Sequence, residues 1–463
     1  CKLHCRIRRN EKGTRRMTSL RSGVKLGLMK KLPLYIFLVL LFSLFTSIKA
    51  SEYTDISNAP QSLKDSGVFK EIDFKKTTRY KSYHIPFRAN PNLATLQYYF
   101  YRDNFFRAPS SSNTYTVFPS QNPYEFNFDL IENKFVIKQL KTKPILSYLY
   151  FENNKIVIDQ ISPDDKFGKF MNNQTKLRSQ SMGKSLVSYV LGHAICEGYI
   201  KSVDSKISDW SLVKNTLYEN HKLIDILNMA SGDQKYVYDS AAIVNGEVDA
   251  DYRGSGTDID PVSVKSNLYL HFRDKKPYKK KYNYNVMNTN LIFNYTLFKT
   301  GDDFQKILDK TFKDKAKIKY PVYFYKKNAS RGQGNADPMF YATRYDYLRI
   351  ALAIMDDYQK QNCVGKYLKE IYERRIPKNL NHDGMRGEPL FNRTKSYGGQ
   401  FHLNYPGLKD KIVFGMGGYG GKAILINVED SRIVILHSQH YNHKKFKYNH
   451  KKLLINPIFK GFK

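Results

Sequence analysis

Apolar residues recur at helical spacing in one stretch of the chain that opens near residue 181. They are Leu186, Val187, Val190, Leu191, Ala194 and Ile195. Positions three or four apart share one face of a helix. Gly198 follows the last of them, and glycine commonly ends a helix. The pattern therefore predicts a buried amphipathic helix that stops near Gly198.

Short β-type runs lie on both sides of a long region that is read mostly as helices and loops, residues 165–405. Residues 145–150 and 155–158 form a hairpin pair, with Glu152-Asn153-Asn154 as the turn. The second group of runs consists of residues 411–414, 422–427 and 432–437. Helical segments are predicted at residues 222–230, 301–315 and 344–359. Strands at both ends with helices between them predict an α+β fold, in which a helical insertion interrupts one antiparallel sheet.

The start of the chain has the character of a targeting leader. Met29 opens a more sensible beginning than Cys1, because two lysines, the uncharged run 32–48 and Ala50 follow it. That order of basic, apolar and small residues is typical of a signal peptide. The run is slightly long for a signal and short for a spanning helix, so an uncleaved anchor is the alternative. Either reading predicts an exported protein, periplasmic or anchored facing the periplasm.

The chain is strongly basic, with a formal net charge of +34. Residues 1–50 hold 12 Lys/Arg and one acidic residue, so +11 lies there and +23 in the rest. A basic body suits acidic polymers, anionic lipid or nucleic acid. The lysines are spread among abundant Asn, Tyr, Ile and Phe, which favours a compositional bias instead. No nucleic-acid motif accompanies the charge, so no nucleic-acid partner is predicted.

The predicted helix begins with Ser181-Met182-Gly183-Lys184, a candidate nucleophile motif. A serine and a lysine three residues apart lie on one helix face, where the ammonium can assist removal of the hydroxyl proton. The stretch Ser22-Gly23-Val24-Lys25 has the same spacing but lies in the basic leader. Only the motif at Ser181 opens a helix, which favours Ser181 as a nucleophile and Lys184 as its proton acceptor.

Three segments together, residues 179–185, 197–204 and 223–232, resemble the serine β-lactamase superfamily in its class C and esterase-like branch. The Ser-x-Ser-Met-x-Lys-Ser form is most similar to the 6-aminohexanoate-dimer hydrolase group. The resemblance covers roughly residues 140–440. It implies an antiparallel sheet flanked by helices beside an all-helical lobe, with the serine between them.

The resemblance also implies a catalytic tyrosine on a loop before a helix. Tyr284 matches that position and Tyr282 the preceding aromatic position, and spacing favours Tyr284 for moving the proton of Ser181 to the leaving group. Val286 stands where the class C form carries an asparagine. Asn285 and Asn288 are candidates to replace its hydrogen bonds.

The third family motif corresponds to the glycine-rich residues 414–422. Backbone N–H groups of Ser181 and of the segment at Gly417, Gly418 and Tyr419 are predicted to form the oxyanion hole. Met416 stands where many relatives carry a cation that binds a substrate carboxylate, and Lys422 is too far along to be an obvious substitute. Upstream, residues 396–402 resemble a segment that lines the acyl pocket.

Other candidate sites are weaker. His437, His440 and His443 recur at every third residue, but the segment leads into a basic tail, so solvated loop histidines are favoured over a metal site. His193 is predicted to be a core residue. No metal and no cofactor are predicted.

The body after the leader contains Cys196 and Cys363, which allow one disulfide. Their pairing stays open at this point. Cys196 lies within the apolar stripe, which favours a buried and inert thiol.

Taken together, the residues predict a leader at 1–50, an N-terminal extension at 51–135 and a serine β-lactamase-like domain at 136–463. The predicted function is an exported serine hydrolase that cleaves a small linear amide or ester through an acyl-enzyme on Ser181. A peptidoglycan D,D-peptidase or β-lactamase-type enzyme is one alternative, and a non-catalytic binding member of the fold is the other. Contact with an anionic envelope polymer or lipid is a further expectation.

Overall fold

The computed structural model describes residues 89–104, 114–236, 268–327, 335–378, 394–408 and 410–462. The predicted leader lies outside the described residues. Among the residues that are described, no helix is both long and apolar enough to cross a membrane.

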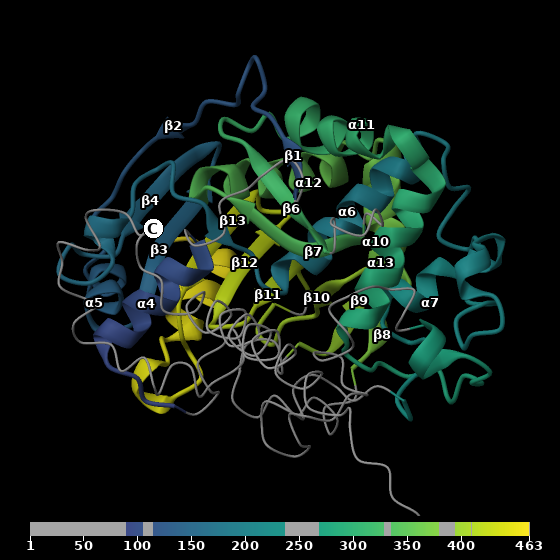
Figure 1. The fold of residues 1–463 in the computed structure, drawn as a ribbon. Coiled ribbons are helices and arrows are strands. Elements are labelled where there is room, and N and C mark those ends of the chain that lie inside the picture. The colour runs from purple at the N-terminus through teal and green to yellow at the C-terminus, as the bar shows by residue number, and fades with distance from the viewer. Residues whose placement is uncertain are drawn as a thin grey trace, which may run out of the picture. The chain divides into compact units, whose positions relative to one another are not determined.

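The main sheet has nine strands within the described part of the chain, in the order β2-β4-β3-β13-β12-β11-β10-β9-β8. Neighbouring strands are antiparallel except for the parallel pair β2 and β4. The strands are β2 (Asn127–Phe128), β3 (Ile145–Glu152), β4 (Lys155–Ile161), β8 (Ile376–Pro377), β9 (Ser396–Gly398), β10 (Phe401–Leu403), β11 (Val413–Gly418), β12 (Lys422–Asn427) and β13 (Arg432–Ser438). Because β3 pairs with β13, the two predicted groups of strands join in one sheet, as expected (Figure 1).

The predicted hairpin turn is confirmed and has a local cause. Asn153 and Asn154 both have positive φ, 52° and 59°, as the two central residues of a type I′ turn require. Asparagine tolerates this backbone region better than most residues. The turn thereby sets the register in which β3 pairs with β4.

A second sheet, of order β1-β6-β7-β5, corrects the prediction that residues 165–405 are mostly helical. Its strands are β1 (Thr114–Val117), β5 (Leu177–Arg178), β6 (Val322–Lys327) and β7 (Asn335–Ala342). Aromatic side chains favour pleated strands, and the rings of Tyr323 and Tyr341 stack with centroids 4.9 Å apart on paired positions. The run of aromatic residues was the missed signal.

The α-helices surround these sheets (Figure 1). They are α4 (Leu93–Asn104), α5 (Lys134–Thr142), α6 (Met182–Cys196), α7 (Leu223–Leu227), α10 (Val286–Thr300), α11 (Phe304–Leu308), α12 (Arg344–Lys360), α13 (Cys363–Glu373) and α15 (Asn456–Lys460). The predicted helices at 222–230, 301–315 and 344–359 correspond to α7, to α11 with a following π-helical turn at Asp309–Lys315, and to α12.

Helix α6 is buried as predicted, but it has no solvent-facing polar side along most of its length. Every residue from Met182 to Ala194 is buried. Two of its buried serines are hydrogen-bonded internally: Ser185 Oγ donates to the carbonyl of Gln400 at 2.6 Å, and Ser188 Oγ lies 2.8 Å from the hydroxyl of Tyr367. The helix is thus held rigidly from several sides.

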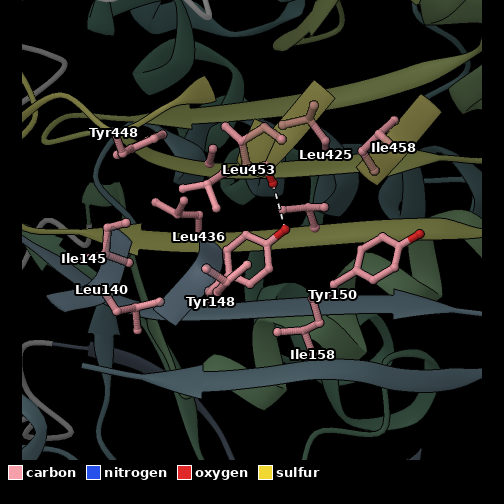
Figure 2. Close-up of a cluster of buried hydrophobic side chains, with 14 of the residues drawn as sticks. Leu140, Ile145, Tyr148, Tyr150, Ile158, Leu425, Leu436, Tyr448, Leu453 and Ile458 are labelled. Atoms are coloured by element: carbon pink, nitrogen blue, oxygen red, sulfur yellow. Dashed lines mark hydrogen bonds between the residues drawn. The ribbon is translucent and has the colours of Figure 1, made fainter. Parts of the chain in front are cut away.

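A hydrophobic cluster fills the space between the main sheet and the C-terminal segment (Figure 2). Tyr148 and Tyr150 on β3 each bury a ring there. The hydroxyl of Tyr148 donates to the carbonyl of Leu453 at 2.7 Å, and that of Tyr150 to Pro457 at 3.2 Å. Each buried phenol thereby avoids the cost of an unsatisfied hydroxyl, and the end of the chain is fixed on the sheet.

A disulfide joins Cys196, at the end of α6, to Cys363, at the start of α13. The Cα atoms lie 5.8 Å apart, within the usual reach of such a bond. The expectation of an inert thiol at Cys196 was therefore wrong. Sequence reasoning left the pairing open, because a separation of 167 positions gives no indication that the two residues meet.

Replacing both cysteines by serine is expected to lower the free energy of unfolding by about 2–4 kcal/mol, because the bridge restricts the unfolded chain. Thermal unfolding with and without dithiothreitol checks this: the reductant should lower the Tm of the natural protein and leave that of the double variant unchanged. Equal Tm values for the oxidised protein and the variant would contradict the prediction.

Candidate active site

Ser181 lies at the N-terminal end of α6, directly after a tight turn. Gln180 has a φ of 51°, a strained backbone for a residue with a β-carbon. The side chain of Ser179 stabilises the turn: its Oγ donates to the carbonyl of Gln180 at 2.9 Å and accepts from the backbone N–H of Phe340 at 3.0 Å. Backbone strain at one residue before a candidate nucleophile is a common feature of functional sites.

Lys184 lies one helical turn after Ser181 and is 7% exposed. Its ammonium is 5.4 Å from the centroid of the Tyr284 ring, and that ring is also buried. The structure thus brings together Lys184 from α6 and Tyr284 from the loop before α10. Tyr282, the alternative tyrosine, has a different cation beside it, Lys378 at 5.5 Å from the ring centroid.

The Tyr282–Tyr284 loop is anchored on Asp233, a fully buried carboxylate that the sequence analysis did not identify. It accepts hydrogen bonds from the hydroxyl of Tyr218 at 2.9 Å and from the side-chain amides of Asn283, Asn285 and Asn288 at 2.8 to 3.2 Å. Burial raises the pKa of Asp233 above its ordinary value, although these donors oppose the shift. The carboxylate thereby fixes the approach of Tyr284 to Lys184.

Asn285 and Asn288 were candidates to replace the asparagine that the class C form has at Val286. Asn285 caps α10 by accepting from the backbone N–H of Asn288 at 3.0 Å. Both amides bind Asp233 and are fully buried. They stabilise the loop instead of presenting hydrogen bonds to a substrate.

Strand β11 ends against the turn that carries Ser181. A β-carbon added at Gly418 would lie 2.6 Å from the carbonyl oxygen of Ser179 and 3.3 Å from the β-carbon of Gln180. Only glycine permits this approach. Gly418 is therefore next to the nucleophile turn, with Gly417 before it and Tyr419 after it, as the oxyanion prediction requires.

Met416, which stands where many relatives are expected to carry a cation, is fully buried on β11 opposite Ile424. Lys422 is buried as well, with Nζ 3.5 Å from the carbonyl of Tyr419. Burial lowers the pKa of Lys422 to about 8.

An aromatic wall lines the other side of the loop. The ring centroid of Tyr397 on β9 lies 5.1 Å from that of Tyr282 and 6.1 Å from that of Tyr284. The ring centroid of His402 on β10 also lies 6.1 Å from that of Tyr284. Burial lowers the pKa of His402 far below its ordinary value, and the charges of Lys378 and Lys184 add to the shift. His402 is therefore a neutral imidazole at physiological pH.

Comparison with solved structures shows the fold. A protein from Bacillus anthracis, assigned as a 6-aminohexanoate-dimer hydrolase, is similar over 74% of this chain and 90% of its own, with a TM-score of 0.55 and 11% identity. A protein from Bacteroides dorei, assigned as a β-lactamase, covers 69% and 93% at a TM-score of 0.49 and 12% identity. The chain has the serine β-lactamase/transpeptidase-like fold. No protein-family model and no curated protein matches the sequence.

The predicted fold is thus confirmed. In this β-lactamase-like fold, the candidate nucleophile lies where α6 meets the end of β11 and the loop before α10. The resemblance found in the motifs is consistent with a structural neighbour of the same assigned group, although the identity is low. The roles of Ser181, Lys184 and Tyr284 remain predictions.

Gln400 is a structural residue of the site that sequence reasoning missed. Its backbone N–H and side-chain amide both donate to the carbonyl of Leu227, its Oε1 accepts from Thr289, and its carbonyl accepts from Ser185. It therefore joins α7, α10 and α6 behind the site. The sequence analysis placed it only in the segment 396–402, and Gly398-Gly399 before it was the available signal for a turn. In the structure the φ of Gln400 is 68°.

The candidate histidines His437, His440 and His443 lie at the end of β13 and in the segment that follows it. Among the residues that the structure describes, no group of His, Cys, Asp or Glu is placed to hold a metal ion. His437 and His440 are fully buried, so the expectation of solvated loop histidines was wrong for these two. Burial lowers the pKa of His437 to about 3. His193 is a core residue as predicted, packed edge-on against Tyr189.

Proposed function

We propose that this protein is an exported serine hydrolase that cleaves a linear amide or ester through an acyl-enzyme on Ser181. The observation that carries the proposal is the position of the Lys184 ammonium, 5.4 Å from the ring of Tyr284 and one helical turn after Ser181. A serine hydroxyl one helical turn before an ammonium that lies beside a phenol has the groups needed to form and protonate an alkoxide.

In the proposed reaction, Ser181 Oγ attacks the substrate carbonyl, and its proton passes to the Lys184–Tyr284 pair. The backbone N–H groups of Ser181 and Tyr419 stabilise the oxyanion. Tyr284 then delivers the proton to the leaving amine or alcohol as the acyl bond forms on Ser181. Water then attacks the carbonyl of the acyl-enzyme and gives a proton to the same Lys184–Tyr284 pair. That proton returns to Ser181 Oγ as the carboxylic acid is released.

The substrate class follows from the third motif. Met416 offers no charge to a carboxylate at the position where β-lactam-binding relatives are expected to carry a cation. A linear amide or ester is therefore favoured over a β-lactam, and a D,D-peptidase activity is the less supported alternative. The Bacillus anthracis neighbour is assigned as a 6-aminohexanoate-dimer hydrolase, which also supports a linear amide as the substrate.

Two features support an exported protein that contacts anionic material. Disulfides persist mainly in oxidising compartments, and Cys196 is bonded to Cys363. Residues 273–281, directly before Tyr282, are all exposed and contain six Lys or Arg and one acidic residue. We infer that this loop meets an anionic envelope polymer or lipid near the site.

The proposal is tested with a fluorophosphonate, which labels activated serines. Intact-mass spectrometry of the natural protein should show one adduct, mapped to Ser181 and absent in Ser181→Ala. Ser188→Ala, which removes a hydroxyl from the same helix, should still be labelled, because Ser188 contacts Tyr367 instead of the site. If no adduct forms under conditions that label a control hydrolase, the proposed hydrolase activity is refuted and a non-catalytic binding protein is favoured.

A further inference from the structure

Three charged groups with little exposure to solvent lie beside the two turns of the predicted oxyanion hole, and the proposed mechanism uses none of them. Arg178 ends β5 and precedes the turn that carries Ser181. Lys422 begins β12 and follows the turn that contains Tyr419. Asp103 lies near the end of α4. The three groups therefore border both segments whose backbone N–H groups are predicted to bind the oxyanion.

The strand that leads into the nucleophile turn is fixed to the end of α4. Nη1 of Arg178 donates to Asp103 Oδ1 at 3.0 Å, and the backbone N–H of Arg178 donates to Asn104 Oδ1 at 3.0 Å. From the other side, β7 faces Arg178 with Tyr341 and Asp337. Charge-assisted bonds between groups with little exposure are strong. Helix α4 therefore helps to set the position of the nucleophile turn.

The turn after β11 is restrained by Lys422, which pairs with Gly418 across the hairpin. A β-carbon added at Gly418 would lie 3.1 Å from the β-carbon of Lys422 and 2.6 Å from the carbonyl oxygen of Ser179. Lys422 thus packs against the residue that contacts the nucleophile turn. Its Nζ lies 3.5 Å from the carbonyl of Tyr419. A buried ammonium attracts a carbonyl more strongly than an exposed one does, so this contact holds the turn that contains Tyr419.

Asp103 acts on Lys422 as well as on Arg178. Burial lowers the pKa of Lys422 to about 8, Asp103 opposes this shift, and Arg178 adds to it. Burial also lowers the pKa of His437 on β13 to about 3, and the charge of Lys422 contributes, so this histidine is neutral. Arginines stay charged and carboxylates stay ionised above about pH 7. Lys422 is therefore the group among these four whose charge changes as the pH rises through about 8.

We propose that Asp103, Arg178 and Lys422 form a positioning clamp for the oxyanion hole. The Asp103 carboxylate attracts both cations and thereby keeps the turn before Ser181 in place against the turn that contains Tyr419. This inference rests on the proposed function and adds positioning residues to its oxyanion hole. The clamp acts through the backbone and takes no part in proton transfer. Helix α4, which belongs to the predicted N-terminal extension, thereby contributes to the active site.

Lys422→Met, which removes the charge and keeps a long side chain, should lower kcat for a nitrophenyl ester about 10-fold at about pH 7. KM should change less than about threefold, because the oxyanion forms only in the transition state. The pH profile is the readout that a purely structural role would not change. In the natural protein kcat should fall as the pH rises through about 8, where the ammonium loses its proton. This fall should be absent in Lys422→Met.

Asp103→Asn keeps the shape of the side chain and removes its charge. It should move the fall in kcat toward lower pH by at least about 0.5, because Asp103 raises the pKa of Lys422. If Lys422→Met did not fold, an unmoved fall in Asp103→Asn would by itself overturn the proposal.

Lys411→Met is the matched control, because Lys411 pairs with Asp430 at 3.1 Å at the opposite end of the same hairpin. It should leave kcat and the pH profile unchanged. The proposal would be overturned by an unchanged kcat and pH profile in folded Lys422→Met, or by an equal loss in Lys411→Met.

An NMR titration of the lysine side chains separates this proposal from the proposed function, because it needs no turnover. In Ser181→Ala, the signal that is lost on adding Lys422→Met should titrate near pH 8, and at lower pH on adding Asp103→Asn. This result in a protein that a fluorophosphonate does not label would refute the hydrolase and keep the clamp. Labelling of Ser181 together with a Lys422 signal that Asp103→Asn does not move would refute the clamp and keep the hydrolase.

Discussion

Tyr284→Phe is expected to lower kcat for ester hydrolysis about 10²–10⁴-fold, the range typical of losing a general acid–base group. The change removes one oxygen atom and retains the ring that packs against Lys184, Tyr397 and His402. KM should change little, because the hydroxyl acts on the proton in the transition state. Steady-state kinetics with a short nitrophenyl ester measure both parameters.

Tyr282→Phe is the control for this prediction, because it removes the same atom from a ring two residues away. Tyr282 lies beside Lys378, so its kcat for a neutral ester should remain within about tenfold of the natural value. If the two variants were reversed in effect, Tyr282 would be the catalytic tyrosine. Equal and small effects would exclude a phenol from the proton path.

The parts of the fold that sequence predicted are those encoded locally. Asn153-Asn154 carries its own turn preference, and α6 is marked by helical spacing of apolar residues. The main sheet was predictable because strands at both ends of the domain need partners, and the simplest arrangement pairs them with one another. The second sheet was missed because β5 has only two residues and β6 pairs across a long separation with β1.

The site was predictable where a motif has fixed spacing and unpredictable where partners come from distant segments. Ser181 and Lys184 share one helix turn, so spacing alone places them together. Asp233 directly follows the matched segment 223–232 but lies outside it, and its partners come from the distant tyrosine loop. Folding brings it to the asparagines of that loop. A buried charge is recognised only once its surroundings are known.

Gly418→Ala is expected to lower kcat about 10²–10³-fold, the loss typical of a damaged oxyanion hole. The added β-carbon would lie 2.6 Å from the carbonyl oxygen of Ser179, which is backbone and cannot rotate away. Either β11 or the turn before Ser181 must therefore move, and the N–H groups of Ser181 and Tyr419 would lose their common target. Steady-state kinetics measure kcat, and thermal unfolding separates this loss from a loss of fold.

Gly415→Ala on the same strand distinguishes local damage from general disruption of β11. Its β-carbon would meet the hydroxyl of Tyr405 at 1.6 Å, a contact with a side chain of the hydrophobic cluster behind the sheet. We expect this variant to lose stability but to keep kcat within about threefold, because the turn before Ser181 is untouched. If Gly415→Ala lowered kcat as much as Gly418→Ala, the strand would act through its overall position. The assignment of the oxyanion hole to the Gly418–Tyr419 end would then be wrong.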